Sequence, residues 1–319
     1  MLGFLLLQCL LGLAVDGSTG IGGGWGYCCE WMLDVRAWSG FVILGLWLGG
    51  ACNLTVRPIL FGPDSGDSTS KGDGSTSGDA AGKCTGHASP DADPGGALSQ
   101  GLVVYYPCEQ ASGSALPDLS GNSRSATLVS SGTGGAAGYS FATGKVGKAL
   151  YLNSASDAHV VLPTGLLANA CEATIAAWVF LNNQSTWQRI WTFSPGGNVY
   201  MFLTTNNDTT GVVRTGITLT ANNADQQSVD GPTELPTRVW TYVAVVLGPA
   251  GLALYVDGVQ VAASSSVTLR PTDMGKTLYD YIGRSNFSWD PYFDGNIDEF
   301  RVYNRALSPA EIQALYSGS

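Results

Sequence analysis

Short apolar runs recur between clusters of turn-forming residues from residue 101 to the C-terminus. The runs are rich in valine, isoleucine, threonine and aromatic residues, which strands prefer. One of them, LALYVDGVQVAA, places Asp257 and Gly258 between two alternating segments, a strong signal for a tight hairpin. Because roughly a dozen such runs follow one another without helical periodicity, the pattern predicts an all-β fold, a two-sheet antiparallel jelly-roll sandwich over residues 101–319.

The C-terminal stretch LSPAEIQALY is the exception to the strand pattern. Ser308 stands three residues before Glu311, the spacing of a capping box, and Pro309 suits the first helical turn. The apolar residues that follow fall on one helical face, which carries Ile312, Leu315 and Tyr316. We therefore predict a short C-terminal helix that packs on the sandwich.

Two adjacent carboxylates in NIDEFRVY, Asp298 and Glu299, raise the question of catalysis. In a regular strand the side chains alternate between faces. One face would carry Ile297, Glu299, Arg301 and Tyr303, and the other would carry Asp298, Phe300 and Val302. The two carboxylates would then point apart and could not flank one scissile bond, as a glycosidase requires. The pattern therefore favours a structural role for the pair.

The remaining composition narrows the function further. The formal net charge is −10, which disfavours binding to nucleic acid or to an anionic membrane surface. The chain has 2 histidines, and neither an HExxH zinc motif nor a GxSxG nucleophile elbow is present. Abundant glycine, serine, threonine and aromatic residues are typical of an extracellular β-protein. We therefore predict a protein that is not an enzyme.

Residues 1–52 are interpreted as an N-terminal leader with an export signal. Two apolar runs lie here, each shorter than the ~20 residues of a spanning helix, and the first basic residue is Arg36. The second run makes the better signal, which places the true start near Met32; the first run as signal, or both runs as membrane segments, are alternatives. The second run ends in LGGAC, which resembles the lipidation signal of bacterial lipoproteins and makes Cys52 a candidate for lipidation; an ordinary cleaved signal is the alternative.

Residues 53–100 are rich in glycine, serine and aspartate and nearly free of large apolar side chains. Such a segment cannot bury enough surface to offset the entropy of ordering, so we predict a disordered linker. Its aspartates lack the regular spacing of a calcium-binding loop. The linker would hold the following domain away from a surface.

A set of motifs in a fixed order carries a family likeness: GLVVYYPCEQASGSALPDLSGNSRSATL, GKVGKALYLN, ATIAAWVFL, RVWTYVAVVLGPAGLALYVDGVQVA, YIGRS and FDGNIDEFRVYNRALSPAEIQALY. Together they resemble the laminin-G-like, concanavalin A-like jelly-roll domain of bacterial secreted proteins, over about residues 101–317. The resemblance implies a sandwich of two curved antiparallel sheets. It also implies a usually non-catalytic module that binds carbohydrate, adheres or binds protein, often with a calcium ion near the chain ends.

Carried over to this chain, the resemblance implies oxygen ligands for a structural Ca²⁺ ion. The candidates are Asp118 and Asn122 of DLSGN, Asp298 of NIDEF and Glu109 of YYPCEQ, where Cys108 replaces the usual aromatic residue. Hard oxygen ligands from loops and a strand suit Ca²⁺. The alternative is that Asp118 and Asn122 shape a turn, which such residues do well.

The cysteines fit an exported protein, in which disulfides persist. Cys108 and Cys171 both fall in the predicted folded domain, at strand ends, and we predict that they pair. Cys84 would then be a single thiol in the linker.

Ligand contacts are expected in polar loops that contain aromatic residues, because sugars stack on exposed rings. Trp187 in NNQSTWQR and Trp289 with Tyr292 in NFSWDPYF meet this description, whereas Trp178 and Trp240 lie within predicted strands. The sequence thus predicts an exported, surface-tethered, non-catalytic module on the outer surface or in the periplasm of a bacterium, with a glycan or a cell-surface protein as partner. A protein–protein adhesion module without a sugar site and a polysaccharide-degrading enzyme on the same fold are the alternatives.

Overall fold

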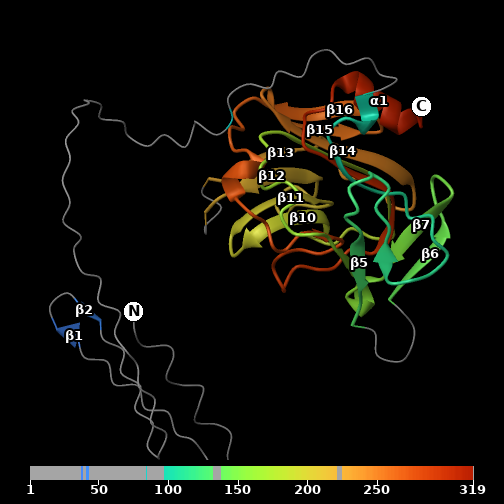
Figure 1. The fold of residues 1–319 in the computed structure, drawn as a ribbon, viewed down its shortest axis with the longest axis horizontal. Helices are drawn as coiled ribbons and strands as arrows, with labels where there is room; N and C mark the ends of the chain where they lie inside the picture. The colour runs from blue at the N-terminus through green and yellow to red at the C-terminus, as the bar shows by residue number, and fades with distance from the viewer. Residues whose placement is uncertain are drawn as a thin grey trace, which may run out of the picture. The chain divides into compact units, whose positions relative to one another are not determined.

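The computed structural model describes residues 84, 97–131, 138–220 and 225–318, together with two short strands nearer the N-terminus (Figure 1). The chain divides into two units, Met1–Gly74 and Ser75–Ser319. In the first unit, strands β1 (Ala37–Trp38) and β2 (Phe41–Val42) pair antiparallel. Lipidation at Cys52, export by residues 1–52 and most of the 53–100 linker lie outside the described residues and stay predictions.

The second unit contains two antiparallel sheets that lie in layers (Figure 1). We call one of them the β10 sheet. Its described strands follow one another in the spatial order β13 (Gln227–Asp230), β12 (Arg214–Thr218), β11 (Val199–Thr204), β10 (Arg189–Gly196), β17 (Tyr281–Ile282), β8 (His159–Val161), β5 (Ala126–Val129) and β4 (Ala115–Leu116).

The other layer is the β14 sheet. Its described strands have the spatial order β16 (Val259–Ser264), β15 (Gly251–Val256), β14 (Trp240–Gly248), β9 (Ala173–Leu181), β18 (Gly295–Tyr303), β7 (Lys148–Leu152) and β6 (Tyr139–Thr143), with β3 (Leu102–Tyr106) also paired to β18. Short 3-10 turns, η2 (Ala97–Ser99), η3 (Ser154–Ser156) and η4 (Pro271–Met274), interrupt the connections. Sequence-distant strands neighbour each other throughout, so the predicted two-sheet sandwich is confirmed.

One large apolar cluster fills the space between the sheets. Inward side chains of the β10 sheet, such as Trp191 and Leu203, meet those of the β14 sheet, such as Val179 and Val245, and all are at most 1% exposed. Burial of these side chains is the main stabilising contribution to the fold. The predicted hairpin is present: Asp257 and Gly258 have φ of 49° and 79°, the positive values that a tight two-residue turn requires.

The predicted C-terminal helix is α1 (Pro309–Ser317), and it covers the outward face of the β14 sheet. Ser308 Oγ accepts a hydrogen bond from the backbone N–H of Glu311 at 3.3 Å, and Glu311 Oε2 accepts from the N–H of Ser308 at 2.8 Å. Ile312 and Leu315 pack against Tyr242 and Trp178 of the sheet. The contact buries Ile312 and Leu315, and α1 thus covers part of the outward face of the β14 sheet.

The alternation predicted for residues 297–303 is wrong, because β18 contains a β-bulge. Asp298 lies opposite Trp178 and Arg301 opposite Ala176, so two residues of β18 face a single residue of β9. Glu299 takes φ of 55° in this bulge. The inward face carries Ile297, Phe300 and Val302, and the outward side carries Asp298, Arg301 and Tyr303.

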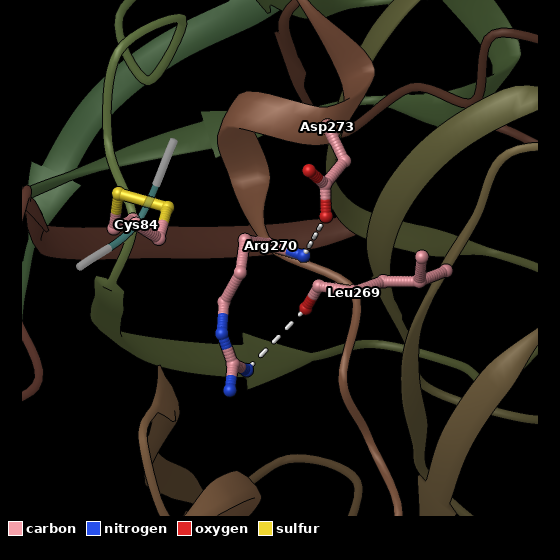
Figure 2. Close-up of a disulfide and its surroundings, with 5 residues drawn as sticks. Cys84, Leu269, Arg270 and Asp273 are labelled. Atoms are coloured by element: carbon pink, nitrogen blue, oxygen red, sulfur yellow. Dashed lines mark hydrogen bonds between the residues drawn. A yellow bond between two sulfur atoms is a disulfide. The ribbon is translucent and has the colours of Figure 1, made fainter. Parts of the chain in front are cut away.

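The predicted disulfide is also wrong. Cys84 pairs with Cys171, with their Cα atoms 5.5 Å apart (Figure 2). Cys108 is a free, buried thiol. The disulfide lies beside η4, whose Thr272 N–H donates to the carbonyl of Ala170 at 3.0 Å. Cys84, predicted to be a single thiol in the linker, thus ties that segment to the sandwich.

Strand register explains why Cys108 and Cys171 cannot pair. Tyr106 lies opposite Phe300, so Cys108 follows β3 toward the Asp298 end of β18. Thr174 lies opposite Tyr303, which places Cys171 beyond the other end of β18. At ~3.3 Å per residue the two cysteines are roughly 20 Å apart along the strand direction. A disulfide requires Cα atoms within about 7 Å.

The folded region begins before residue 101. The 3-10 turn η2 falls inside the predicted 53–100 linker, and the carbonyl of Gln100 accepts from Arg305 Nε at 2.8 Å. Among the described residues, no helix is long and apolar enough to cross a membrane.

Candidate functional site

Strand register places a row of side chains across the outward face of the β10 sheet. Thr127, Val161, Tyr281, Thr192, Phe202, Gly216 and Ser228 are successive cross-strand partners in this row. The residues that alternate with them, such as Val160, Ile282 and Leu203, belong to the core between the sheets. The outward face is therefore mixed polar and aromatic, unlike the apolar inward face.

The connection between β17 and β18 runs over this face, and we call it the 283–294 loop. Its ends are held together because the N–H of Phe293 donates to the carbonyl of Gly283 at 2.9 Å. Within it, Ser285 Oγ donates to Asp290 Oδ2 at 2.7 Å. These bonds fix a compact loop whose side chains lie against the sheet and along its rim.

Trp289 is the most exposed aromatic side chain of the loop, at 78% exposure. Its ring stacks on Phe287, with centroids 4.9 Å apart and an interplanar angle of 25°. Phe287 in turn meets the edge of Tyr200 on β11, with centroids 5.3 Å apart. One ring face of Trp289 is thus supported from below, and the side chain rests on a rigid strand through two aromatic contacts.

Arg189 of β10 is the buried charge at the centre of this face, and its side chain is 3% exposed. Its guanidinium lies 4.1 Å from the Phe202 ring centroid and 5.2 Å from that of Trp187. The nearest acidic partner among the described residues is Asp290 of the 283–294 loop, with Nη2 3.7 Å from Oδ2. Burial lowers the pKa of Arg189 to about 10, and Asp290 opposes this shift.

A second cationic group, Arg284, lies on the same face beside β8. Its guanidinium is 4.7 Å from the Tyr281 ring centroid and 5.8 Å from that of Tyr292. Its Nη1 lies 3.3 Å from His159 Nε2. Burial and the nearby Arg284 charge lower the pKa of His159, so the imidazole is neutral at pH 7.

Several polar atoms on and around this face are buried without a hydrogen-bond partner in the described part of the chain. They include donors and acceptors: Arg189 Nε and Nη1, Thr192 Oγ1, Asn206 Oδ1 and Asn286 Oδ1. Buried polar groups are nearly always hydrogen-bonded, and ordered water is the common partner of such atoms.

The three aromatic residues predicted to contact ligand all belong to this face. Trp187 is half-buried over Arg189, and the backbone N–H of Trp187 donates to the carbonyl of Asn206 at 2.9 Å. Tyr292 is half-buried beside His159, with ring centroids 5.6 Å apart. Trp289 is largely exposed. The structure therefore brings Trp187, Trp289 and Tyr292 to one surface, and their contact with ligand stays a prediction.

The predicted calcium ligands do not converge. Asp118 accepts from the N–H groups of Tyr105 and Arg124 at 3.0 and 2.9 Å, and also from Ser120. Asn122 donates through Nδ2 to the carbonyls of Leu102 and Val103 at 2.8 and 3.1 Å. Both side chains therefore shape the turn between β4 and β5 and fix it against β3, which agrees with the predicted alternative that Asp118 and Asn122 shape a turn.

The other two candidates hold a different turn, residues 144–148. Glu109 accepts from the N–H of Lys148 at 3.2 and 3.1 Å, and Asp298 accepts from the N–H of Val146 at 2.9 Å. Burial raises the pKa of Asp298 to about 7, and the neighbouring Glu299 charge adds to the rise. Within the described ranges, no group of three or more His, Cys, Asp or Glu side chains could hold a metal ion. These four residues do not form one calcium site, and calcium binding stays a prediction.

Asp298 and Glu299 are both occupied by contacts within the protein. Asp298 is 0% exposed. Glu299, 9% exposed, accepts from Tyr105 Oη at 2.8 Å and from Arg301 Nη2 at 2.6 Å. The hydrogen bonds of Glu299 hold the strained bulge, and neither carboxylate is presented on an open face.

The comparisons with known proteins agree with this architecture. The family model described as the concanavalin A-like lectin/glucanases superfamily matches residues 154–313. The chain belongs to this superfamily. The superfamily assignment confirms the predicted family, and the matched segment contains β8 to β18 and all the aromatic residues of the outward face described above. No curated protein sequence matches the chain.

Solved structures of this superfamily's architecture align with the described domain. Domain 4 of AbnA, a GH43 extracellular arabinanase from Geobacillus stearothermophilus solved with arabinotriose, is 24% identical, with a TM-score of 0.55. The alignment covers 67% of this chain and 98% of that one. The sialidase of Trypanosoma rangeli is 18% identical with a TM-score of 0.47, over 68% of this chain and 33% of that one. The similarity to the arabinanase domain shows that the two domains share a fold.

Sequence reasoning missed Arg189, Arg284, Phe287 and His159. Arg189 opens the strand RIWTFS and Arg284 ends YIGRS, so each is a single cation at the end of an apolar run. That position is a weak signal, and only the register of β10, β17 and β8 shows that these strands are neighbours in one sheet.

Proposed function

We propose that the chain is a non-catalytic recognition module that binds a glycan on the outward face of the β10 sheet. The observation that carries the proposal is Trp289, 78% exposed yet held flat on Phe287. An exposed indole ring backed by a second ring presents a flat apolar surface to solvent. Sugars present an apolar C–H face that stacks on such a ring.

Polar side chains of the 283–294 loop, which carries Trp289, support a hydroxyl-rich ligand. Ser288 is exposed, and Arg284 and Asn286 are half-buried. A hydroxyl group both donates and accepts hydrogen bonds, so a sugar can pair with the donors and the acceptors of these groups.

The superfamily favours the same function. Domain 4 of the arabinanase aligns with this chain over 98% of the length of domain 4, and it was solved with arabinotriose. Arabino-oligosaccharides are therefore the first probes to use. A disulfide in the described domain and the concanavalin A-like architecture favour an extracellular location. A leader in residues 1–52 and a lipid anchor at Cys52 would tether the module to a surface. The internal contacts of Asp298 and Glu299 favour binding over hydrolysis.

The test is binding of the purified protein to a glycan array, followed by calorimetry with arabino-oligosaccharides and with any array hits. We expect Trp289→Ala to weaken binding about 5-fold to 30-fold, because loss of one stacking contact removes about 1–2 kcal/mol. Val259→Ala is the matched control, since Val259 is 62% exposed and lies on the β14 sheet. Absence of any glycan binding, or equal binding by Trp289→Ala, would refute the proposal.

A further inference from the structure

We propose that Arg284 makes the site selective for a sugar that carries a carboxylate, such as a uronic acid. The inference rests on the proposed function, because it names the ligand class of the same face. It depends on three observations about Arg284: how its side chain is held, what its histidine neighbour can offer, and the absence of an acidic partner in the described part of the chain.

The Arg284 guanidinium is held by aromatic rings while it remains half-exposed. Tyr281 and Tyr292 lie 4.7 and 5.8 Å from it, measured to the ring centroids. Stacking of this kind uses the flat face of the group and leaves its N–H edges available. Those edges match the two oxygens of a carboxylate in a bidentate contact.

The hydrogen bonds of His159 determine its tautomer and therefore which ring nitrogen accepts from Arg284. Its Nδ1 lies 2.7 Å from the backbone carbonyl of Asp157, which can only accept, so Nδ1 carries the proton. Nε2 is then the acceptor for Arg284 Nη1 at 3.3 Å. His159 therefore orients the guanidinium but contributes no negative charge to balance it.

No carboxylate of the described residues balances Arg284 either. The arginine ion pairs join Arg189 to Asp290, Arg214 to Asp230, Arg301 to Glu299 and Arg305 to Glu311, and none includes Arg284. The adjacent Asp280 is 0% exposed and is engaged by Thr277 Oγ1 at 2.7 Å and by the N–H of Ser194 at 3.3 Å. In a chain with a net charge of −10, this oriented cation is free to pair with an anionic group of a ligand.

Arg284 and Trp289 belong to one ligand surface. They stand five positions apart in the 283–294 loop, which the Ser285–Asp290 hydrogen bond closes at 2.7 Å. A saccharide that stacks on Trp289 can therefore extend toward Arg284 along the same face. The repulsion between an acidic protein and an acidic glycan is screened beyond ~8 Å at physiological salt. The affinity for the carboxylate is therefore set mainly by its contact with Arg284.

The experiment compares one uronic-acid oligosaccharide with its carboxyl-reduced, neutral counterpart by calorimetry. Wild type should bind the acidic ligand at least about 10-fold more tightly than the reduced one, since a charged hydrogen-bonded pair contributes about 1.5–3 kcal/mol. Arg284→Met should remove this preference, so that the variant binds the acidic and the reduced ligand with affinities within about 2-fold of each other. Arg284→Lys, which keeps the charge without the fork, should retain part of the preference.

Lys145→Met is the matched control. Lys145 also places its cation over an aromatic ring, 4.3 Å from the centroid of Trp178, but on the outward face of the β14 sheet. It changes the net charge by the same amount and should leave both affinities unchanged. An equal effect of Lys145→Met and Arg284→Met would show that only net charge matters and would overturn the inference.

The outcomes separate this inference from the proposed function. Binding of neutral glycans with no acidic preference in wild type overturns the role of Arg284 and leaves the proposed function in place. Absence of binding to any glycan overturns both. Should Arg284→Met fail to fold in thermal melts, the wild-type comparison of acidic with reduced ligand decides the question by itself.

Discussion

The Cys84–Cys171 disulfide gives a stability prediction with a definite magnitude. The two residues are 87 positions apart, so the bond closes a large loop in the unfolded chain. By loop-closure entropy alone, a loop of this length corresponds to about 4.5 kcal/mol of stabilisation at 25 °C. Cys84→Ser should therefore lower the free energy of unfolding by up to about 4.5 kcal/mol.

The effect is large enough for thermal and denaturant unfolding. For a domain of this size about 1 kcal/mol corresponds to roughly 2–4 °C in Tm, so we expect a drop of roughly 9–18 °C. Reductant should lower the Tm of wild type by the same amount and leave Cys84→Ser unchanged. Urea unfolding monitored by fluorescence of the buried tryptophans provides an independent measurement.

Cys108→Ala is the control that separates cross-linking from packing. Cys108 is buried at 1% exposure and belongs to the core between the sheets. Cys108→Ala should lower the free energy of unfolding by about 1–2 kcal/mol through lost packing, both with and without reductant. A Cys84→Ser variant as stable as wild type, or non-reducing peptide maps that join Cys108 to Cys171, would refute this account.

Three further predictions concern buried groups. Burial raises the pKa of Asp280 to about 7, so the free energy of unfolding should fall as pH rises from about 4 to about 7, by up to about 1.4 kcal/mol per pH unit. Urea unfolding at pH 5 and pH 7 should show this slope, and Asp280→Asn should flatten it; an unchanged slope would contradict the assignment. Glu311→Gln should lower the free energy of unfolding by about 3 kcal/mol in chemical denaturation. The reason is that it removes the negative charge that lies 2.7 Å from the buried Arg305 guanidinium. Gly295→Ala should lower the Tm markedly, since a Cβ at this position would lie 2.1 Å from the carbonyl oxygen of Phe180 and φ is 153°; a Tm equal to that of wild type would show that β18 and β9 can separate.

The fold class, the strands and the C-terminal helix were determined by local sequence signals. The Ser308–Glu311 capping box and the Asp257-Gly258 turn act over a few residues, so a short window contains their whole physical cause. The same holds for the continuous apolar runs, rich in β-branched and aromatic residues, that became β9 and β14. Trp289 could be proposed as a ligand contact because a tryptophan in a polar loop is conspicuous without any tertiary information.

The tertiary structure alone decided which distant residues meet. The bulge in β18 depends on contacts of Glu299 with Tyr105, 194 positions away, so it has no signature in NIDEFRVY itself. The disulfide partner of Cys171 depends on strand register, which places Cys108 at the opposite end of β18. The surface formed by Arg284, His159 and Trp289 likewise combines β8, β17 and a loop. A jelly-roll pairs strands far apart in the chain, and for this reason its site residues gather through topology and not through sequence spacing.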